Sequence, residues 1–279
     1  MTRTAKSLKV LAVSAAAALA LTACGGGGTS STSSSAAGSA SSGGASAVTL
    51  LNAGTLTVCS DVPYPPFEYL ENNQTVGYDI DIANEIAKDL NAKVSVIDDS
   101  FESIQSGLAL AKCDVSISSI SITDERKNVM DFSSPYLDDD LALFAKDGSG
   151  ITDLNSAKGK RVGVQGATTG EKYAKSNGLD TMQFEDGGLQ VQALKNGQVD
   201  AVLGNISVLN YGLKDSPEFK NVANFPTGEK LGVAVKKGNT ALLDSVNKTI
   251  KRITDSGDLE KYKEKYGLST PAAAASSSK

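Results

Sequence analysis

Apolar positions recur at two alternating spacings in the first half of the chain. Short apolar runs at 55–58, 94–97 and 114–117 are typical of β-strands. Between them, apolar residues return at helical spacing in the segments 80–90 and 104–111. Strands that alternate with helices predict a parallel α/β construction.

The alternation restarts in the second half of the chain. Strand-like runs stand at 161–164 and 201–203, and a helix is expected at 169–176 between them. The run 231–235 is apolar again, and residues 242–253 have the spacing of an amphipathic helix that could pack back on the first helix. The sequence therefore predicts two α/β units in succession.

Small polar residues follow several of the expected strands. In open parallel sheets, ligands bind beyond the carboxyl ends of strands, where loops and helix N-termini converge. The residues at these places suit a small zwitterion: Ser60-Asp61, Ser118 to Ser121, Gly166 to Thr169 and Gly204-Asn205. The pattern alone indicates a small polar ligand.

Residues 1–23 have the pattern of a secretory signal peptide. Three basic residues precede an apolar stretch that is too short to span a bilayer. The stretch ends at Leu21-Thr-Ala-Cys24, which resembles the lipobox of bacterial lipoproteins. That resemblance implies cleavage before Cys24 and acylation of its sulfur and its new amino group. An ordinary signal peptide with a chance cysteine is the alternative.

The segment after Cys24 is almost wholly Gly, Ser, Ala and Thr up to residue 47. Such a composition cannot offset its ordering entropy by burial, so we expect residues 24–47 to be a flexible tether with a reach of roughly 25 Å from the membrane. Residues 271–279 predict a disordered tail for the same reason. The folded part is expected between 48 and 270.

Composition narrows the function further. Without the leader, 24 of the 27 basic residues remain against 32 acidic ones, a net charge of −8, and no basic cluster marks a nucleic-acid surface. The sequence has no histidine, which excludes a His-based triad and every His-containing zinc site. We expect neither a metal nor a cofactor.

Cys59 and Cys113 form an even pair in what would be an oxidising compartment, where a disulfide is favoured. Strand register argues against it. If the strands that carry them are parallel neighbours, Cys59 lies level with Ser116 rather than Cys113, and the thiols would be about 10 Å apart. A disulfide and two free thiols both stay open.

Six segments follow one another at the spacings of a known family: Ser60–Phe67, Gly77–Ile82, Ile117–Arg126, Asp131–Tyr136, Lys160–Val164 and Asn196–Val202. Over about residues 54–268 the chain resembles the bacterial extracellular solute-binding proteins of family 3. These include the lysine/arginine/ornithine-, histidine- and glutamine-binding proteins of ABC importers. The segments are weak signals one by one, and their order makes the resemblance specific.

The resemblance implies a two-lobed α/β fold of the periplasmic-binding-protein kind (type II), with two crossover hinge strands that let the lobes close on a ligand. Lobe one would comprise 48–138 plus 234–270, and lobe two 139–233. It further implies a monomeric, extracytoplasmic protein that holds an amino acid or a derivative and delivers it to the permease subunits of an importer. The lipid on Cys24 would anchor it to the cell membrane.

The resemblance also implies the residues that contact the ligand. Arg126 would grip the ligand carboxylate, because its guanidinium offers two parallel donors to two oxygens. Thr169 would stand at a helix start, where free N–H groups favour an anion. The partners of the carboxylate and ammonium would be Ser118, Ser119 and Ser121, and those of the ligand side chain Asp61, Tyr64 and Phe101.

Most of these residues have a structural alternative. Ser118, Ser119 and Ser121 could simply be turn residues at a strand end. Arg126 could pair with Asp124 or Glu125 at a helix start, Thr169 could be an ordinary N-cap, and Phe101 could belong to the core. One position departs from the family pattern, because Asn205 stands where relatives have an ammonium-binding Asp. An amide gives a weaker bond to an ammonium than a carboxylate does. The ligand's nitrogen is therefore bound with less help, modified, placed differently or absent.

Two other classes of function remain open on this fold. One is an enzyme, as in the dehydratases and lytic transglycosylases of the same architecture, with carboxylates such as Asp61 or Glu171 as acid or base. The other is a ligand-binding sensory module. No second carboxylate fixed in place and no activated nucleophile marks the enzyme class, so binding without chemistry is the main prediction.

Overall fold

The computed structural model describes residues 48–269. The segments expected to be the signal peptide, the acylated Cys24, the tether and the tail 271–279 lie outside these residues. None of the helices described between 48 and 269 combines the length and the hydropathy needed to cross a membrane.

Two five-stranded sheets organise the described residues. The first has the order β4-β1-β5-β14-β6. In it, β1 pairs in parallel with β4 and β5, whereas β14 pairs antiparallel with β5 and β6. The strands are β1 (Thr55–Ser60), β4 (Lys93–Asp98), β5 (Val115–Ser116), β6 (Met130–Phe132) and β14 (Ala234–Lys236).

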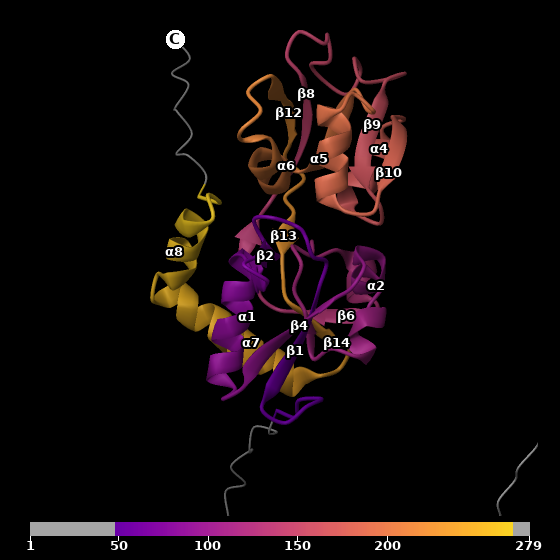
Figure 1. Cartoon of the computed structure of the whole chain (residues 1–279). Helices are drawn as coiled ribbons and strands as arrows, with labels where there is room; N and C mark the ends of the chain where they lie inside the picture. The colour runs from indigo at the N-terminus through magenta and orange to yellow at the C-terminus, as the bar shows by residue number, and fades with distance from the viewer. Residues whose placement is uncertain (1–47, 270–279) are drawn as a thin grey trace, which may run out of the picture. The chain divides into compact units, whose positions relative to one another are not determined.

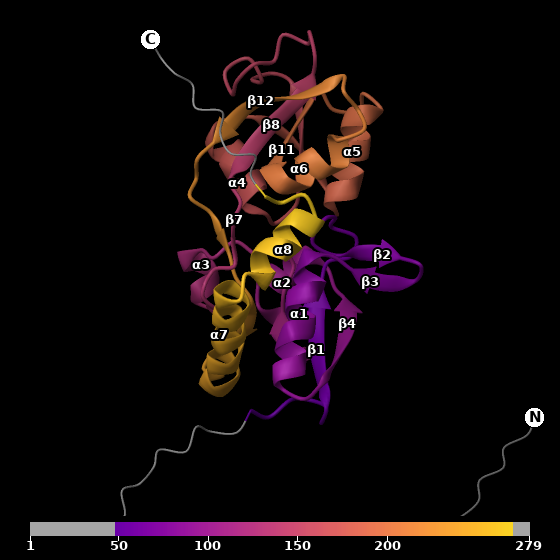
Figure 2. The same cartoon turned by 90° about the vertical axis from the view of Figure 1, so that its left-hand side faces the viewer.

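Helices cover both faces of the first sheet. Because side chains alternate along a strand, Leu56 and Val58 of β1 pack on one face and Cys59 on the other. The face of Leu56 is covered by α1 (Tyr78–Asp89), α7 (Thr240–Asp255) and α8 (Asp258–Lys265). Figures 1 and 2 show α7 beside α1, which confirms that the late amphipathic helix returns to the first one.

The prediction of one helix over 104–111 is wrong. Gly107 adopts a φ of 79° and separates α2 (Phe101–Gln105) from a 3₁₀ turn at Leu108–Ala111. Smaller elements complete this part of the chain, namely the hairpin β2 (Tyr69–Glu71) and β3 (Gln74–Val76), and the short helix α3 (Asp124–Lys127).

The second sheet has the order β10-β9-β11-β8-β12. Its strands are β8 (Leu141–Lys146), β9 (Arg161–Gln165), β10 (Asp180–Phe184), β11 (Ala201–Asn205) and β12 (Phe219–Phe225). Leu141 and Leu143 pack toward α4 (Thr169–Ser176), while Ala142 and Phe144 pack toward α5 (Gly187–Lys195) and α6 (Ile206–Leu213). Both faces of this sheet are therefore buried, as in doubly wound α/β proteins.

Two short crossover strands connect the sheets. The chain leaves the first sheet through β7 (Leu137–Asp138) and returns through β13 (Lys230–Leu231). The two strands pair antiparallel with each other. We call the first sheet with its helices lobe one and the second sheet with its helices lobe two.

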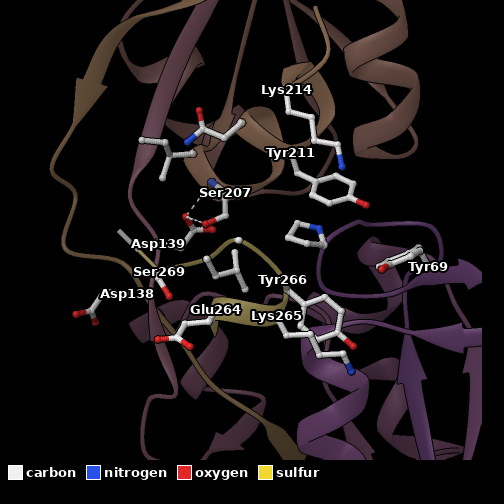
Figure 3. Close-up of a pocket in the computed structure, with 15 residues that line it drawn as sticks. Tyr69, Asp138, Asp139, Ser207, Tyr211, Lys214, Glu264, Lys265, Tyr266 and Ser269 are labelled. Carbon is white, nitrogen blue, oxygen red and sulfur yellow. Dashed lines mark hydrogen bonds between the residues drawn. The ribbon is translucent and has the colours of Figure 1, made fainter. Parts of the chain in front are cut away.

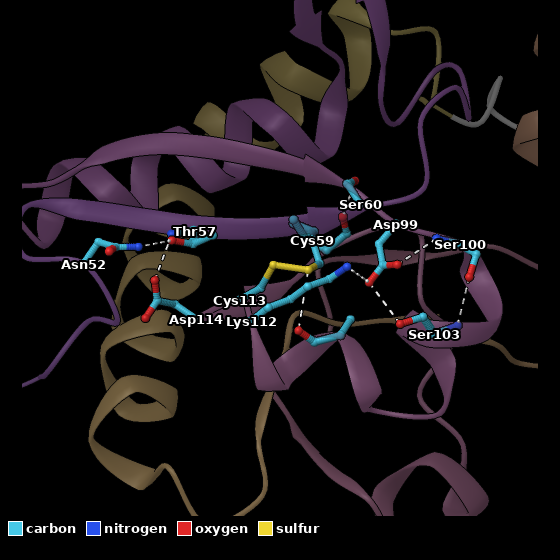
Figure 4. Close-up of a disulfide and its surroundings, with 12 residues drawn as sticks. Asn52, Thr57, Cys59, Ser60, Asp99, Ser100, Ser103, Lys112, Cys113 and Asp114 are labelled. Atoms are coloured by element: carbon cyan, nitrogen blue, oxygen red, sulfur yellow. Dashed lines mark hydrogen bonds and ion pairs between the residues drawn. A yellow bond between two sulfur atoms is a disulfide. The ribbon is translucent and has the colours of Figure 1, made fainter. Parts of the chain in front are cut away.

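A disulfide joins Cys59 and Cys113, whose Cα atoms are 5.7 Å apart (Figure 4). The predicted register holds, because Cys59 lies level with Ser116. The inferred separation of the thiols is nevertheless wrong. The N–H of Cys113 donates to the carbonyl of Ala109 at the end of the 3₁₀ turn, so Cys113 does not continue the line of β5. The turn brings its sulfur back to β1.

Candidate functional site: the faces of the two lobes

Arg126 is a buried cation held by main-chain carbonyls. It is 4% exposed, and its Nη1 and Nη2 donate to the carbonyls of Ser121 and Ala167 at 3.0 and 3.2 Å. Its Cζ lies 5.2 Å from the centroid of the Phe101 ring. Burial lowers the pKa of Arg126 to about 10. The helix-start alternative does not occur, since Arg126 pairs with neither Asp124 nor Glu125.

Within residues 48–269, Arg126 has no carboxylate at ion-pair distance. Leaving a buried charge without a counter-charge is costly. Because one of its two carbonyl partners belongs to lobe one and the other precedes α4 of lobe two, the guanidinium lies where the lobes meet. A ligand carboxylate at this place would supply the missing negative charge.

The loop after β5 carries three predicted contact residues, all buried. Ser118 Oγ donates to Glu68 and accepts from the N–H of Asp61 at 3.0 Å. The N–H of Ser119 donates to Asp79 Oδ2 at 2.7 Å. Ser121 Oγ donates to Glu229 Oε2 at 2.6 Å.

Two buried carboxyl groups accept hydrogen bonds from this loop. Glu68 and Asp79 are both fully buried, and each has one oxygen with no partner among the described residues. Burial raises the pKa of Asp79 to about 7, and burial together with the charge of Asp79 raises that of Glu68 well above its usual range. Neither group was predicted from the sequence to belong to the site.

Thr169 faces the cleft from lobe two but does not cap its helix. The N-cap of α4 is Thr168, whose hydroxyl accepts from the N–H of Glu171 at 3.1 Å. Thr169 Oγ1 instead donates to Glu229 Oε2 at 2.8 Å. The N-cap alternative therefore applies to the preceding residue.

Asp61, which was predicted to contact the ligand side chain, lies at the contact between the two lobes. Asp61 Oδ2 accepts from Gln165 Nε2 of lobe two at 2.8 Å. Burial raises the pKa of Asp61 to about 7, and the charges of Asp186, Asp98 and Glu185 add to the shift. The side-chain oxygen of Gln165, Oε1, is buried and has no hydrogen-bond partner among residues 48–269.

The two predicted aromatic residues lie close to groups of lobe two. Phe101 lines a cavity of about 520 Å³ together with Ala167 and Glu185. Tyr64 is 8% exposed and packs so close to Gly187 that a Cβ there would lie 2.7 Å from its ring. Arg126 and Thr169 line a second cavity of about 380 Å³.

Asn205 ends β11 and is 5% exposed. Its Nδ2 donates to the carbonyl of Asp139 at 3.1 Å. The Asp139 carboxylate accepts from the N–H and the hydroxyl of Ser207, and burial raises its pKa to about 7. The amide of Asn205 is thus tied to the start of lobe two and brings no charge to the cleft.

A further cavity, of about 730 Å³, contains none of the nine predicted contact residues (Figure 3). Tyr69, Tyr211 and Tyr266 line it, and Lys214 Nζ lies 3.9 Å from the centroid of the Tyr211 ring. It lies beside Asp139 and Ser207, on elements that do not carry Arg126. Residues 48–269 hold no group of three or more side chains suited to a metal ion.

Glu229 was not predicted from the sequence, and it lies between the predicted residues Ser121 and Thr169 of the two lobes. Glu229 directly precedes the hinge strand β13. It neither follows a predicted strand nor belongs to one of the segments that carry the family resemblance. Gln165 and Glu185 could have been found, because they stand at the carboxyl ends of β9 and β10, the kind of position that had already singled out Ser60-Asp61.

Comparison with known proteins finds a family match and relatives that are named as amino-acid-binding proteins. Residues 56–269 match the profile of the bacterial extracellular solute-binding proteins, family 3. The chain is 32% identical to the putative ABC transporter arginine-binding protein 2 of Escherichia coli, over 77% of this chain and 91% of that protein.

Two solved structures are similar over nearly their whole length. A mutant of the arginine-binding protein of T. maritima gives a TM-score of 0.73 at 30% identity, covering 77% of this chain and 95% of the other. An ancestral arginine-binding protein bound to arginine gives 0.72 at 38% identity, covering 76% and 98%. These matches confirm the two-lobed fold that the sequence predicts.

Proposed function

We propose that this chain, which belongs to the bacterial extracellular solute-binding proteins of family 3, captures a cationic α-amino acid between its lobes for an ABC importer. The observation that carries the proposal is the buried Arg126 guanidinium, which has no carboxylate partner in residues 48–269 and contacts carbonyls of both lobes. A ligand carboxylate bound there would hold the lobes together, because it would neutralise a charge that both lobes enclose.

The side-chain end of the site favours a positive charge. Asp61 is buried against Gln165, and the charges of Asp186, Asp98 and Glu185 act on it. A guanidinium or ammonium group on the ligand would relieve the repulsion among these carboxylates. The arginine-binding relatives support arginine as the first ligand to test.

Calorimetric titration with L-arginine, L-lysine, L-glutamine and L-cystine tests the proposal. We expect L-arginine to bind most tightly and to be recovered with unchanged mass after prolonged incubation. Tighter binding of a neutral amino acid would contradict the cationic class. Depletion of the ligand would instead indicate an enzyme on the same fold.

The route of delivery belongs to the same proposal. A monomer tethered outside the cell membrane by lipid on Cys24 would meet the permease subunits by diffusion in two dimensions. We expect metabolic labelling with a fatty acid to disappear in Cys24→Ser, with release of the protein from the membrane fraction. Labelling that persists in this variant would contradict the assignment of Cys24.

A further inference from the structure

A zwitterion needs a negative group beside its ammonium, and position 205 does not provide one. Asn205 carries no charge, and its Nδ2 donates to the Asp139 carbonyl. The Asp139 carboxyl is itself committed to Ser207 through both the N–H and the hydroxyl. The carboxylate that would bind an ammonium must therefore come from another element.

Glu229 is such a carboxylate, and it stands between the lobes. Its Oε2 accepts from Ser121 Oγ of lobe one at 2.6 Å and from Thr169 Oγ1 of lobe two at 2.8 Å. Its Oε1 accepts from Thr227 at 3.3 Å. An ionised carboxylate has about four acceptor positions, so one stays available for a further donor.

No Lys or Arg among residues 48–269 lies within ion-pair distance of Glu229. Glu229 is nevertheless the strongest of the charges that favour the cationic form of Arg126, against the burial that lowers the pKa of that residue. The two opposite charges are thus close but do not form a direct pair.

Ser121 joins the two charges through its own polar groups. Its carbonyl accepts from Arg126 Nη1 at 3.0 Å, and its hydroxyl donates to Glu229. A cation and an anion held on either side of one residue match the two ends of an α-amino acid, whose ammonium and carboxylate are attached to one carbon atom.

We propose that Glu229 supplies the ammonium-binding carboxylate that position 205 lacks, so that Arg126 and Glu229 together recognise the zwitterion. This inference rests on the proposed amino-acid function. Glu229 directly precedes β13, so the same contact would couple recognition of the ammonium to a hinge strand.

The geometry leaves one competing role for Glu229. Its carboxylate could occupy the place of the ligand carboxylate, since it accepts from two of the hydroxyls expected to face the ligand. In that role it would have to move away before binding, and removal of its charge would strengthen binding. The two roles therefore predict opposite effects of one substitution.

The test compares Glu229→Gln with the wild type, using L-arginine and 5-guanidinopentanoic acid, which is arginine without its α-ammonium. Glutamine keeps an oxygen that accepts from Ser121 and Thr169. We expect the variant to lose about 10- to 100-fold in affinity for L-arginine, the effect of replacing a charged acceptor by a neutral one. Its affinity for the des-amino analogue should change by less than about threefold.

Two further variants complete the experiment. Glu218→Gln removes one exposed charge of lobe two away from the cleft and should leave both affinities unchanged. Asn205→Asp in the Glu229→Gln background should recover part of the lost affinity for L-arginine.

Equal losses for both ligands, or tighter binding of L-arginine by Glu229→Gln, would overturn the assignment of Glu229. If no amino acid binds to the wild-type protein, the proposed function itself fails.

Discussion

Within lobe one, the Arg126 side chain is held by the carbonyl of Ser121 and the face of Phe101, and these two contacts do not require a ligand. Arg126→Ala should therefore remove the charge that faces the ligand carboxylate while leaving the loop around it intact. We expect a loss of about 2–5 kcal/mol in binding, or roughly 30- to 4,000-fold in affinity, measured by calorimetry.

Arg161→Ala is the matched control for this loss. Arg161 is half exposed and pairs with Asp200 at the start of β9, the end opposite Gln165, so its removal should leave the affinity unchanged. A ligand that carries a carboxylate and still binds Arg126→Ala with wild-type affinity would contradict the assignment of Arg126.

Asp61 should make binding of a cationic ligand depend on pH. Burial raises the pKa of Asp61 to about 7, and a bound cation would lower it again by favouring the ionised carboxylate. Binding therefore releases a proton from Asp61 near neutral pH. Affinity should fall as the pH drops below 7, by up to about tenfold per pH unit until the pKa of the bound form is reached.

Calorimetry with L-arginine between pH 5 and pH 8 measures this dependence. Asp79 and Asp139 also have a pKa of about 7, so a variant is needed to assign the effect to one group. Asp61→Asn should bind more weakly at pH 8 and lose most of the slope. A slope that is unchanged in Asp61→Asn would place its origin in another carboxyl group.

For single residues, the sequence predicted which side chains lie between the lobes better than it predicted their hydrogen-bond partners. Ser121 and Thr169 were predicted to face the ligand, and their hydroxyls converge on one atom, Glu229 Oε2. The identity of that atom depends on how two distant segments come together. Glu68 and Asp79 were missed for a related reason, since a buried carboxyl has no signature in sequence and is found only by its surroundings.

At the scale of elements, the disulfide fixes the 3₁₀ turn to β1. Cys59 and Cys113 are 54 residues apart in the sequence, and closing a loop of that size stabilises a fold by about 4 kcal/mol on chain-entropy grounds. We expect Cys59→Ala with Cys113→Ala to lower the free energy of unfolding by about 2–4 kcal/mol, measured by urea denaturation.

Both cysteines pack in the core cluster that also contains Phe101, and that cluster includes none of the polar residues predicted to contact the ligand. The affinity for L-arginine should accordingly stay within about threefold of the wild type at a temperature where both proteins are folded. A double variant as stable as the wild type would show that the crosslink contributes nothing to the folded state.

The helices and strands that were predicted well from the sequence are those whose apolar residues keep one spacing over the whole element. The helix expected at 169–176 has the same bounds as α4. No strand was predicted for β8, β10 or β12. β10 and β12 are the two edges of the second sheet and have several exposed residues, whereas β8 is an inner strand whose first five residues are all buried. The helix expected at 104–111 failed at Gly107, whose positive φ interrupts a spacing that is otherwise helical.

At the scale of the whole molecule, the lobes are linked by side chains as well as by β7 and β13. Asp61 bonds to Gln165, Arg126 to the carbonyl of Ala167, and Glu125 to Lys172. The first two links belong to the proposed site, so a ligand that binds Arg126 acts directly on the contact between the lobes. The two-lobed fold was predictable from the resemblance, whereas these links depend on side chains that no single motif contains.

The position of β14 within the first sheet determines the order in which the lobes can be completed during synthesis. β14 lies between β5 and β6, yet it follows the whole of lobe two in the chain. A ribosome that has released residues 48–229 has supplied every strand of lobe two, while lobe one still lacks an inner strand. Lobe two should therefore fold first, against the usual N-terminal-first order of domains.

Limited proteolysis of a chain that stops at residue 229 would reveal this order. Lobe two should persist as a resistant fragment from about residue 139, and β1 to β6 should be digested. During this interval the edges of β5 and β6 are unpaired, which is the condition under which strands join other chains. A nascent chain would thus be most prone to aggregation after lobe two has folded and before β14 completes lobe one.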